Sequence, residues 1–268
     1  MQNFNFTRPT SVADAVAAHK SSADASYISG GQTLIPVMKQ GLAMPEDVID
    51  LNSVAGLAGV TVDGNAVTIG ATTRHADVAR SEDVKKAIPA LAHLAGVIGD
   101  PQVRNRGTIG GSVANNDPSA DYPSAVLALN ATVITDRREI AAEDFFAGLF
   151  STSLDEGEMI TAMKFPIPEK SGYAKFPNPA SRYALVGVFV AKGKNGARVA
   201  VTGAGQDGVF RSAVLEDALN KDFSAAHLRD IDIPEDDLMT DMHAAADYRA
   251  HLIGVMCARA VAQANGKA

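Results

Sequence analysis

The feature that most limits how this chain can fold is a pair of loops that each contain two adjacent glycines, Ser29–Thr33 and Thr108–Ser112. The first lies between a predicted strand over residues 25–29 and a predicted helix over residues 33–41. Glycine has no Cβ, so it tolerates a positive φ angle and lets the backbone come close to a ligand. Amide groups exposed where the following helix begins can hold a phosphate oxygen. The loop is neither the Gly-x-Gly-x-x-Gly dinucleotide fingerprint nor a P-loop, and taken alone it also fits a tight strand-to-helix turn.

The second loop is part of a longer polar segment that runs from Arg104 to Asp121. Its glycine pair, Gly110-Gly111, again offers backbone amides without side chains. The asparagine and aspartate residues that follow supply hydrogen-bonding groups in a short span. A carboxylate accepts hydrogen bonds, so Asp121 suits ribityl or ribose hydroxyl groups, although an Asn/Asp-rich surface turn is the alternative. Together the two loops could clamp the two phosphates of a long dinucleotide.

Around these loops, short strand patterns alternate with helical ones, which predicts an α+β protein. Asp63-Gly64-Asn65 is typical of a hairpin turn, and Ser11 with Asp14 resembles a capping box that begins a helix. We expect strands at residues 25–29, 48–51, 59–62, 66–69, 131–135, 139–142, 159–165, 183–191 and 198–203. We expect helices at residues 12–19, 33–41, 74–80, 82–98 with an interruption at Pro89, 122–129, 213–219 and 243–264.

Two further segments are predicted to lack regular structure. The stretch from Gly99 to Pro118 is rich in glycine, asparagine and proline, and we expect a loop there. The stretch from Pro166 to Pro179 is rich in proline, lysine and glycine, which is typical of a domain boundary. We therefore expect two domains that meet near residue 170.

Composition restricts the chemistry. The 268 residues include 24 Lys and Arg against 31 Asp and Glu, a net charge of −7, which argues against nucleic acid as a partner. The single cysteine, Cys257, excludes an internal disulfide and also a cysteine-ligated iron–sulfur cluster within the chain, which needs about four thiolates. Cys257 lies in an apolar helical pattern and is expected in the core. No histidine pair has metal-ligand spacing, so redox chemistry would need an organic cofactor.

Nothing in the sequence predicts a membrane span, because no apolar run is long enough. The first residues lack the basic head and apolar stretch of a secretory signal. We therefore expect a cytoplasmic protein.

The two glycine motifs, Ser29-Gly-Gly-Gln-Thr33 and Thr108-Ile-Gly-Gly111, resemble in order and separation those of the FAD-binding medium subunit of molybdenum hydroxylases, the carbon monoxide dehydrogenase and xanthine dehydrogenase group. The resemblance continues through Asp117-Pro-Ser-Ala-Asp121, the opening Phe4-x-Phe6-x-x-Pro9-x-Ser11 and the late Ala246-Asp-Tyr-Arg249, and covers nearly the whole chain. It implies an FAD-binding domain of the vanillyl-alcohol-oxidase (PCMH) type over residues 1–170. It also implies a small C-terminal α+β domain of the CO dehydrogenase flavoprotein type over residues 171–268.

The resemblance also implies which residues bind FAD. Both motifs are expected along the diphosphate, with Asn115 and Asp121 near the adenosine or ribityl part and Ile98 and Ile160 at apolar positions beside the cofactor. The implied cofactor-binding set is Ile28, Ser29, Gly30, Gly31, Gln32, Thr33, Leu34, Ile98, Thr108, Ile109, Gly110, Gly111, Ser112, Asn115, Asp121, Ile160 and Tyr183. No catalytic base and no metal ligand is implied.

A few positions allow two interpretations. Xanthine-oxidising relatives carry a lysine near the start of the second domain that touches the flavin, whereas Asn178 occupies the nearest position here, which argues against NAD as the acceptor. Tyr183 is expected over the isoalloxazine ring, as in some relatives, or alternatively packed on the core at the start of a strand. His75 is either close to the flavin or an ordinary helix-start histidine. Arg104 and Arg106 either pair with a phosphate or partner subunit or are solvated.

The function implied is that of an FAD-binding electron-transfer subunit. Its partners would be a large subunit with a molybdenum cofactor and a small subunit with 2Fe–2S clusters, assembled as a dimer of heterotrimers. FAD would accept electrons from the clusters and pass them to an external acceptor. The alternatives are a stand-alone FAD-dependent oxidase of the vanillyl-alcohol-oxidase type and a non-catalytic nucleotide-binding module.

Overall fold

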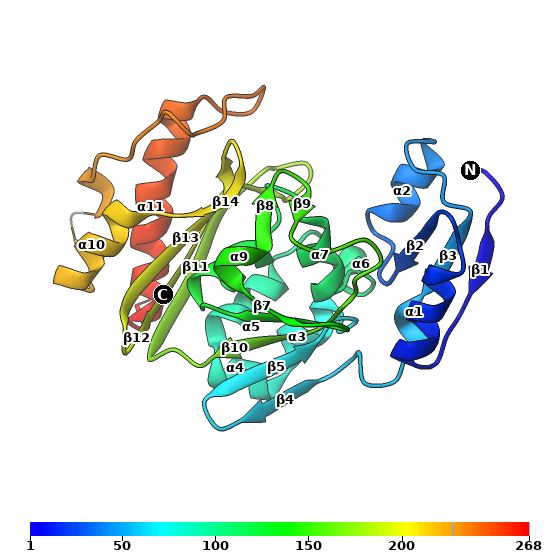
Figure 1. The fold of residues 1–268 in the computed structure, drawn as a ribbon. Helices are drawn as coiled ribbons and strands as arrows, with labels where there is room; N and C mark the ends of the chain where they lie inside the picture. Colours follow the sequence, from blue (N-terminus) through cyan, green and yellow to red (C-terminus); the bar gives the residue numbers. More distant parts are fainter. Residues whose placement is uncertain (227, 268) are drawn as a thin grey trace.

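The computed structural model describes residues 1–226 and 228–267. Figure 1 shows a small N-terminal unit at one end, a second sheet with its helices at the other, and a central sheet between them. The N-terminal unit is a parallel sheet in the order β1-β3-β2 with two helices. Its elements are β1 (Asn5–Thr7), α1 (Val12–Lys20), β2 (Ala25–Ile28), α2 (Leu34–Lys39), β3 (Asp47–Asp50) and the short helix η1 (Leu51–Ser53).

Local chemistry explains where these elements begin. Ser11 accepts a hydrogen bond from the backbone N–H of Asp14 at 3.1 Å, so it is the N-cap of α1, as predicted. The predicted strand after α1 is confirmed as β2, and it runs directly into the first glycine loop. That loop therefore lies at the carboxyl end of a strand, where the chain turns into α2.

The central unit is an antiparallel sheet in the order β4-β5-β10-β6-β7, with most of its helices between β5 and β6. The predicted hairpin is confirmed, since β4 and β5 pair on either side of Asp63-Gly64-Asn65 and Gly64 has a φ angle of 56°. Its strands are β4 (Val60–Asp63), β5 (Ala66–Gly70), β6 (Thr132–Thr135), β7 (Glu139–Ala141) and β10 (Ile160–Pro166), with the small hairpin β8 (Phe146–Gly148) and β9 (Ser151–Thr152). Its helices are α3 (His75–Arg80), α4 (Glu82–Ala87), α5 (Pro89–Gly96), α6 (Pro101–Arg104), α7 (Ile109–Asn115), α8 (Tyr122–Ala128) and α9 (Ala142–Phe145).

The second sheet is an antiparallel meander in the order β11-β12-β13-β14, followed by helices. Both of its faces are buried. Tyr173, Phe189 and Ala200 belong to the core of the central unit, whereas Val188 and Val199 belong to a core shared with the C-terminal helices. The elements are β11 (Lys170–Pro177), β12 (Ala184–Gly193), β13 (Gly196–Gly205), β14 (Gly208–Arg211), α10 (Ala213–Lys221), η2 (Leu228–Asp230) and α11 (Ala246–Ala264). Cys257 is fully buried on α11, as predicted.

Two segments predicted as irregular contain regular structure. The predicted loop from Gly99 to Pro118 includes α6 and α7, because Asp100 and Thr108 cap the two helices by accepting hydrogen bonds from backbone N–H groups. The proline-rich stretch from Pro166 to Pro179 contains β11, whose residues pair with β12 over its full length. Here the glycine and lysine content hid a strand with two buried faces. Among the described helices, none is long and apolar enough to cross a membrane.

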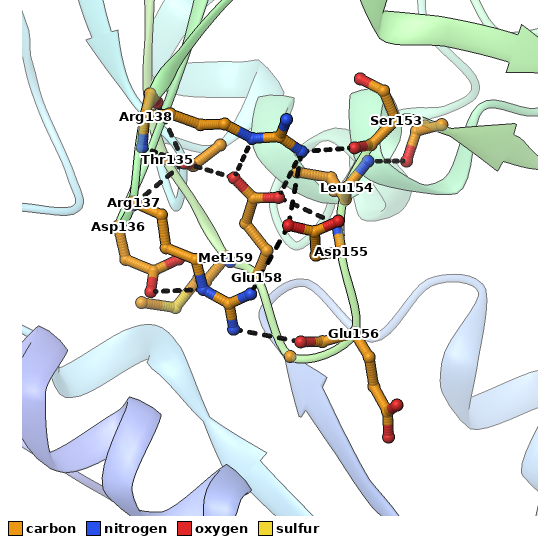
Figure 2. A network of polar contacts seen from close by, with 12 residues as sticks. Thr135, Asp136, Arg137, Arg138, Ser153, Leu154, Asp155, Glu156, Glu158 and Met159 are labelled. Atoms are coloured by element: carbon orange, nitrogen blue, oxygen red, sulfur yellow. Dashed lines mark hydrogen bonds and ion pairs between the residues drawn. The ribbon is translucent and has the colours of Figure 1, made fainter.

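A buried carboxylate organises the loop that precedes β10 (Figure 2). The side chain of Glu158 has 0% exposure and receives two hydrogen bonds from the Arg138 guanidinium, at 3.0 and 2.9 Å. The Thr135 hydroxyl donates to it at 2.7 Å and the Asp155 backbone N–H at 2.8 Å. The Arg138 guanidinium, above all, lowers the pKa of Glu158 to about 2. The carboxylate is therefore ionised, and it accepts hydrogen bonds both from the end of β6 with the segment that follows it and from its own loop.

The same loop touches the N-terminal unit. The Tyr27 hydroxyl donates to the Gly157 carbonyl oxygen at 3.3 Å. Gly157 has a φ angle of 65°, and a Cβ there would lie 2.7 Å from the His19 imidazole. Through these contacts, the loop before β10 links the central sheet to β2, the strand that leads into the first glycine loop.

Candidate functional site

The two glycine loops meet at backbone distance. A Cβ on Gly30 would lie 2.4 Å from the Arg106 carbonyl oxygen and 2.7 Å from Gly107 Cα, so only glycine fits at position 30. A Cβ on Gly107 would in turn lie 2.5 Å from His75 Nε2. The Thr108 hydroxyl donates to Ser29 Oγ at 3.1 Å, which links the loops through side chains. The glycines therefore let the two loops approach each other, besides any close approach of a ligand that they allow.

The loops differ in what their backbones can offer a ligand. Within the described residues, no backbone N–H from Gly30 to Thr33 donates a hydrogen bond, and Gly31 has a φ angle of 71°. The sequence also predicted free backbone amides in the second loop, but its glycine amides are already hydrogen-bonded. Its amides bond within the fold, Gly110 N–H to the Ala71 carbonyl at 2.8 Å and Gly111 N–H to Thr108 Oγ1 at 3.3 Å, because they begin a capped helix. Free donors for an anion thus come from the first loop.

Two cavities open on either side of this meeting point. A cleft of about 310 Å³ lies toward the second sheet, and a cavity of about 390 Å³ lies toward β2 and Gly157. Four residues, Gly30, Gly31, Gly111 and Asn115, line both cavities. The two cavities with this shared waist suit an elongated ligand whose anionic part lies at the unpaired amides.

Most of the predicted cofactor residues line these cavities, but three do not. The cleft is lined by Gly30, Gly31, Gln32, Thr33, Ile98, Thr108, Gly111, Ser112, Asn115, Asp121 and Tyr183 from the predicted set. Ile28, Ser29 and Leu34 line the other cavity. Ile109, Gly110 and Ile160 line neither, because Ile109 and Ile160 are buried in the central core and a Cβ on Gly110 would lie 2.6 Å from Ala71. A role for these three beside the cofactor stays a prediction.

A buried triad joins the cleft to the second sheet. Asp121 is 4% exposed, and its carboxylate accepts hydrogen bonds from the Tyr173 hydroxyl and, at 3.2 Å to Oδ2, from Lys175 Nζ. Lys175 Nζ also lies 2.9 Å from Asp121 Oδ1, as an ion pair. Burial raises the pKa of Asp121, and the Lys175 ammonium acts in the opposite direction. Sequence reasoning missed Tyr173 and Lys175. Alternation along β11 would have pointed both inward, toward the same face.

Tyr183 and His75 also line the cleft. The Tyr183 side chain is 47% exposed just before β12, so the alternative in which it packs on the core is wrong. His75 begins α3 and is only 4% exposed, with its Nδ1 atom buried and unpaired within the described residues. Burial first, and the Arg104 charge second, lower the pKa of His75 to about 4. The imidazole is therefore neutral near pH 7.

The sequence of the first 168 residues decides the family. Residues 2–168 match the model of the FAD binding domain in molybdopterin dehydrogenase. The chain belongs to this family. The predicted resemblance to medium subunits of molybdenum hydroxylases and the predicted α+β FAD-binding fold are both confirmed.

Relatives of this family align over nearly the full chain. The carbon monoxide dehydrogenase medium chain of Afipia carboxidovorans is 34% identical and aligns over 99% of this chain and 98% of its own. The nicotine 6-hydroxylase medium subunit of Paenarthrobacter nicotinovorans is 33% identical, over 98% and 97%. Among solved structures, carbon monoxide dehydrogenase from Hydrogenophaga pseudoflava aligns with a TM-score of 0.87 at 33% identity, over 99% of this chain and 98% of that chain. Quinoline 2-oxidoreductase from Pseudomonas putida 86 aligns with a TM-score of 0.90 at 26% identity, over the same shares.

The burial of His75 predicts how stability depends on pH. The pKa of this group is lower in the folded chain, about 4, than its ordinary 6.5, so the unfolded chain binds more protons between these values. Its contribution is complete above about pH 6.5 and is lost as the pH falls toward 4. We expect the cofactor-free chain to lose about 2 kcal/mol of unfolding free energy between pH 6.5 and 4.5 from this histidine.

Urea unfolding at several pH values measures this loss. His75→Gln should flatten the pH dependence in that interval, whereas His251→Gln, which changes an exposed histidine on α11, should leave it unchanged. Equal slopes for His75→Gln and the unchanged chain would show that His75 protonates freely in the fold.

Proposed function

We propose that this protein is the FAD-binding electron-transfer subunit of a molybdenum hydroxylase complex. The observation that carries the proposal is the pair of cavities joined at unpaired amides, in a chain of the FAD-binding family. Relatives that match it end to end are named medium chains or medium subunits, which supports a role beside other subunits. When bound, FAD would supply two-electron redox chemistry that no side chain of this protein provides.

We further propose how the chain holds the cofactor. The unpaired amides from Gly30 to Thr33 would donate to the diphosphate, with Ser112 and Asn115 opposite. The cleft with Ile98, Asp121 and Tyr183 would take the flavin and ribityl part, and the cavity with Ile28 and Leu34 the adenosine part. Tyr183 would cover the flavin on its solvent side, since it is half-exposed at the cleft.

Three finer statements belong to the same proposal. Residues 1–170 would form the FAD-binding domain and residues 171–268 the C-terminal domain, which is supported by the family match that ends at residue 168. The molybdenum cofactor and the 2Fe–2S clusters would lie on a large and a small partner subunit. The complex would be a dimer of heterotrimers. The cytoplasmic location stays a prediction.

The proposal predicts a division of labour between chains. The isolated chain should bind about one FAD and show no flavin reduction by carbon monoxide, aldehydes, purines or N-heterocycles, because the substrate would react on another subunit. Mixed with the two subunits encoded beside it, the same flavin should lose its absorbance when the substrate of the complex is added. Anaerobic absorbance spectroscopy of the flavin band before and after addition measures both states.

Two controls accompany this experiment. Dithionite should reduce the flavin in either state. Acid precipitation should release it as FAD, because Cys257 is buried on α11 and the His75 imidazole at the cleft is only 4% exposed. Rapid reduction of the isolated chain by a substrate would favour a stand-alone flavin oxidase instead. Purified chain without flavin absorbance, even after addition of FAD, would favour a non-catalytic nucleotide-binding module.

A further inference from the structure

A third open cavity, of about 540 Å³, lies beside the cofactor cleft. Gly99 and Arg182 line both cavities, so the two cavities share part of their walls. The cavity forms where the end of α5 and the loop into α6 face β11 and the turn after it. A molecule held there would lie next to whatever fills the cleft.

The ionisable groups around this cavity are all basic. His93, Arg104, Lys175 and Arg182 line it, and no aspartate or glutamate does. This is unexpected in a chain with 31 acidic residues against 24 lysines and arginines. Clustered charges of one sign produce a local potential that attracts the opposite charge. The cavity is therefore a positive region on a negatively charged protein.

The Arg104 guanidinium is held in place, and the positive charges of the cavity are only partly compensated. Arg104 donates to the Ile98 carbonyl at 2.9 Å and to the Gly99 carbonyl at 3.1 Å, contacts that orient the guanidinium without neutralising it. Lys175 is the one whose charge is matched, by Asp121 at 2.9 Å. In the described part of the chain, Arg104 and Arg182 form no ion pair. Burial, and next the Lys175 ammonium, lower the pKa of His93, which agrees with a positive local potential.

We propose that this cavity binds the anionic group of the small-molecule electron acceptor that reoxidises the flavin. The inference rests on the proposed function, because it needs reduced FAD in the neighbouring cleft. The acceptor would be an organic oxidant that carries a carboxylate, phosphate or sulfonate. It takes two electrons and two protons from the reduced cofactor, which leaves FAD oxidised. Arg104 and Arg182 bind the anionic group, and Lys175 keeps Asp121 satisfied at the boundary with the cleft.

Direct binding tests the site without any turnover. The probe is naphthalene-2-sulfonate, which has one negative charge and no redox activity, titrated by calorimetry into the oxidised FAD-loaded chain. We expect binding that weakens about fivefold or more in Arg104→Gln and in Arg182→Gln, since each removes one full charge from the cavity. Arg259→Gln, which removes an exposed charge on α11, is the matched control and should bind as the unchanged chain does.

Reoxidation kinetics test the role as an acceptor site. After dithionite reduction, the flavin is mixed with 1,4-naphthoquinone-2-sulfonate or with neutral 1,4-naphthoquinone in a stopped-flow instrument. Because both oxidants share the naphthoquinone ring, the ratio of the sulfonate's rate constant to that of the neutral quinone isolates the effect of the negative charge when variants are compared. This ratio should fall about threefold or more in each cavity variant and stay constant in Arg259→Gln, and salt should lower it in the unchanged chain. The assembled complex should show the same preference.

The outcomes separate the two proposals. Absence of flavin absorbance contradicts the proposed function itself, before any probe is added. A flavin-loaded chain that does not bind the sulfonate, or binds it equally in all variants, overturns only the acceptor site. Binding by the isolated chain that disappears in the assembled complex would show that an acidic surface of a partner subunit covers the cavity, which also overturns the acceptor site.

Discussion

Replacing Gly30 with alanine should weaken FAD binding about a hundredfold, equivalent to about 2.7 kcal/mol. The added Cβ would lie 2.4 Å from the Arg106 carbonyl oxygen, whereas a carbon and an oxygen in contact need about 3.3 Å. Neither group can turn away: the Cβ is attached directly to the backbone, and the Arg106 carbonyl belongs to the backbone just before the capped helix α7. The two loops must therefore move apart, and the waist that would hold the diphosphate widens. Titration of the apoprotein with FAD, followed by flavin fluorescence, measures the change.

Gly193→Ala is the matched control, because a Cβ there meets no described atom within 4 Å and its φ angle needs no glycine. It should bind FAD like the unchanged chain. Gly110→Ala offers a contrast: its Cβ would lie 2.7 Å from the Ala71 carbonyl oxygen inside the core, so the free energy of unfolding should fall as well. FAD affinity within threefold of the unchanged chain in Gly30→Ala would mean that the loop contact does not shape the cofactor site.

Glu158→Ala should lower the free energy of unfolding by about 2 kcal/mol, because it removes a buried carboxylate that accepts four hydrogen bonds, while the Arg138 guanidinium left behind is 44% exposed. The substitution leaves the Arg138 guanidinium, the Thr135 hydroxyl and the Asp155 N–H without their common acceptor (Figure 2). FAD affinity should fall too, because the loop that supports the N-terminal unit is released. Guanidinium chloride unfolding of the two proteins gives the difference directly.

Glu156→Ala is the control for this change, since Glu156 lies two residues away with an exposed side chain. This substitution should lower the free energy of unfolding by less than about 0.5 kcal/mol. The pKa of Glu158, about 2, is below its ordinary 4.5, so the carboxylate stabilises the fold above about pH 4.5 and this contribution is lost as the pH falls toward 2. The difference between the unchanged chain and Glu158→Ala should shrink over that interval. A difference that does not depend on pH would assign the effect to packing alone.

The sequence could predict the elements whose signals are local. The Ser11 cap, the Asp63-Gly64-Asn65 hairpin and the strand–glycine–helix order at Ser29–Thr33 depend on residues within a few positions of each other, and the structure contains all three. It could also predict that the two glycine loops belong together, through their resemblance to a family. The helices α6 and α7 were missed because short capped helices in a glycine-rich segment have no apolar periodicity.

What could not be predicted depends on distant pairs. The reason for Gly30 is a carbonyl oxygen at position 106, and the reason for Gly107 is the imidazole of His75. Neither contact has a local signal. The Asp121–Lys175 pair joins the start of α8 to β11, and the sequence places Lys175 in a segment with the composition of a linker. The roles of such residues depend on tertiary contacts, which only the folded structure shows.

The two-faced second sheet has a consequence for the order of events during biosynthesis. α5 and α8 leave the ribosome before β12 and β13, the strands that α8 packs against. Until residue 205 has been translated, the emerging chain presents an uncovered apolar surface that a chaperone can recognise. Ser181, Arg182 and Tyr183, which line the cleft, are also made after both glycine loops, so the cleft lacks this side at that stage. We therefore expect cofactor loading to be a late event of maturation. We expect a truncated chain that ends before the second sheet to lose the cofactor and to expose its apolar core.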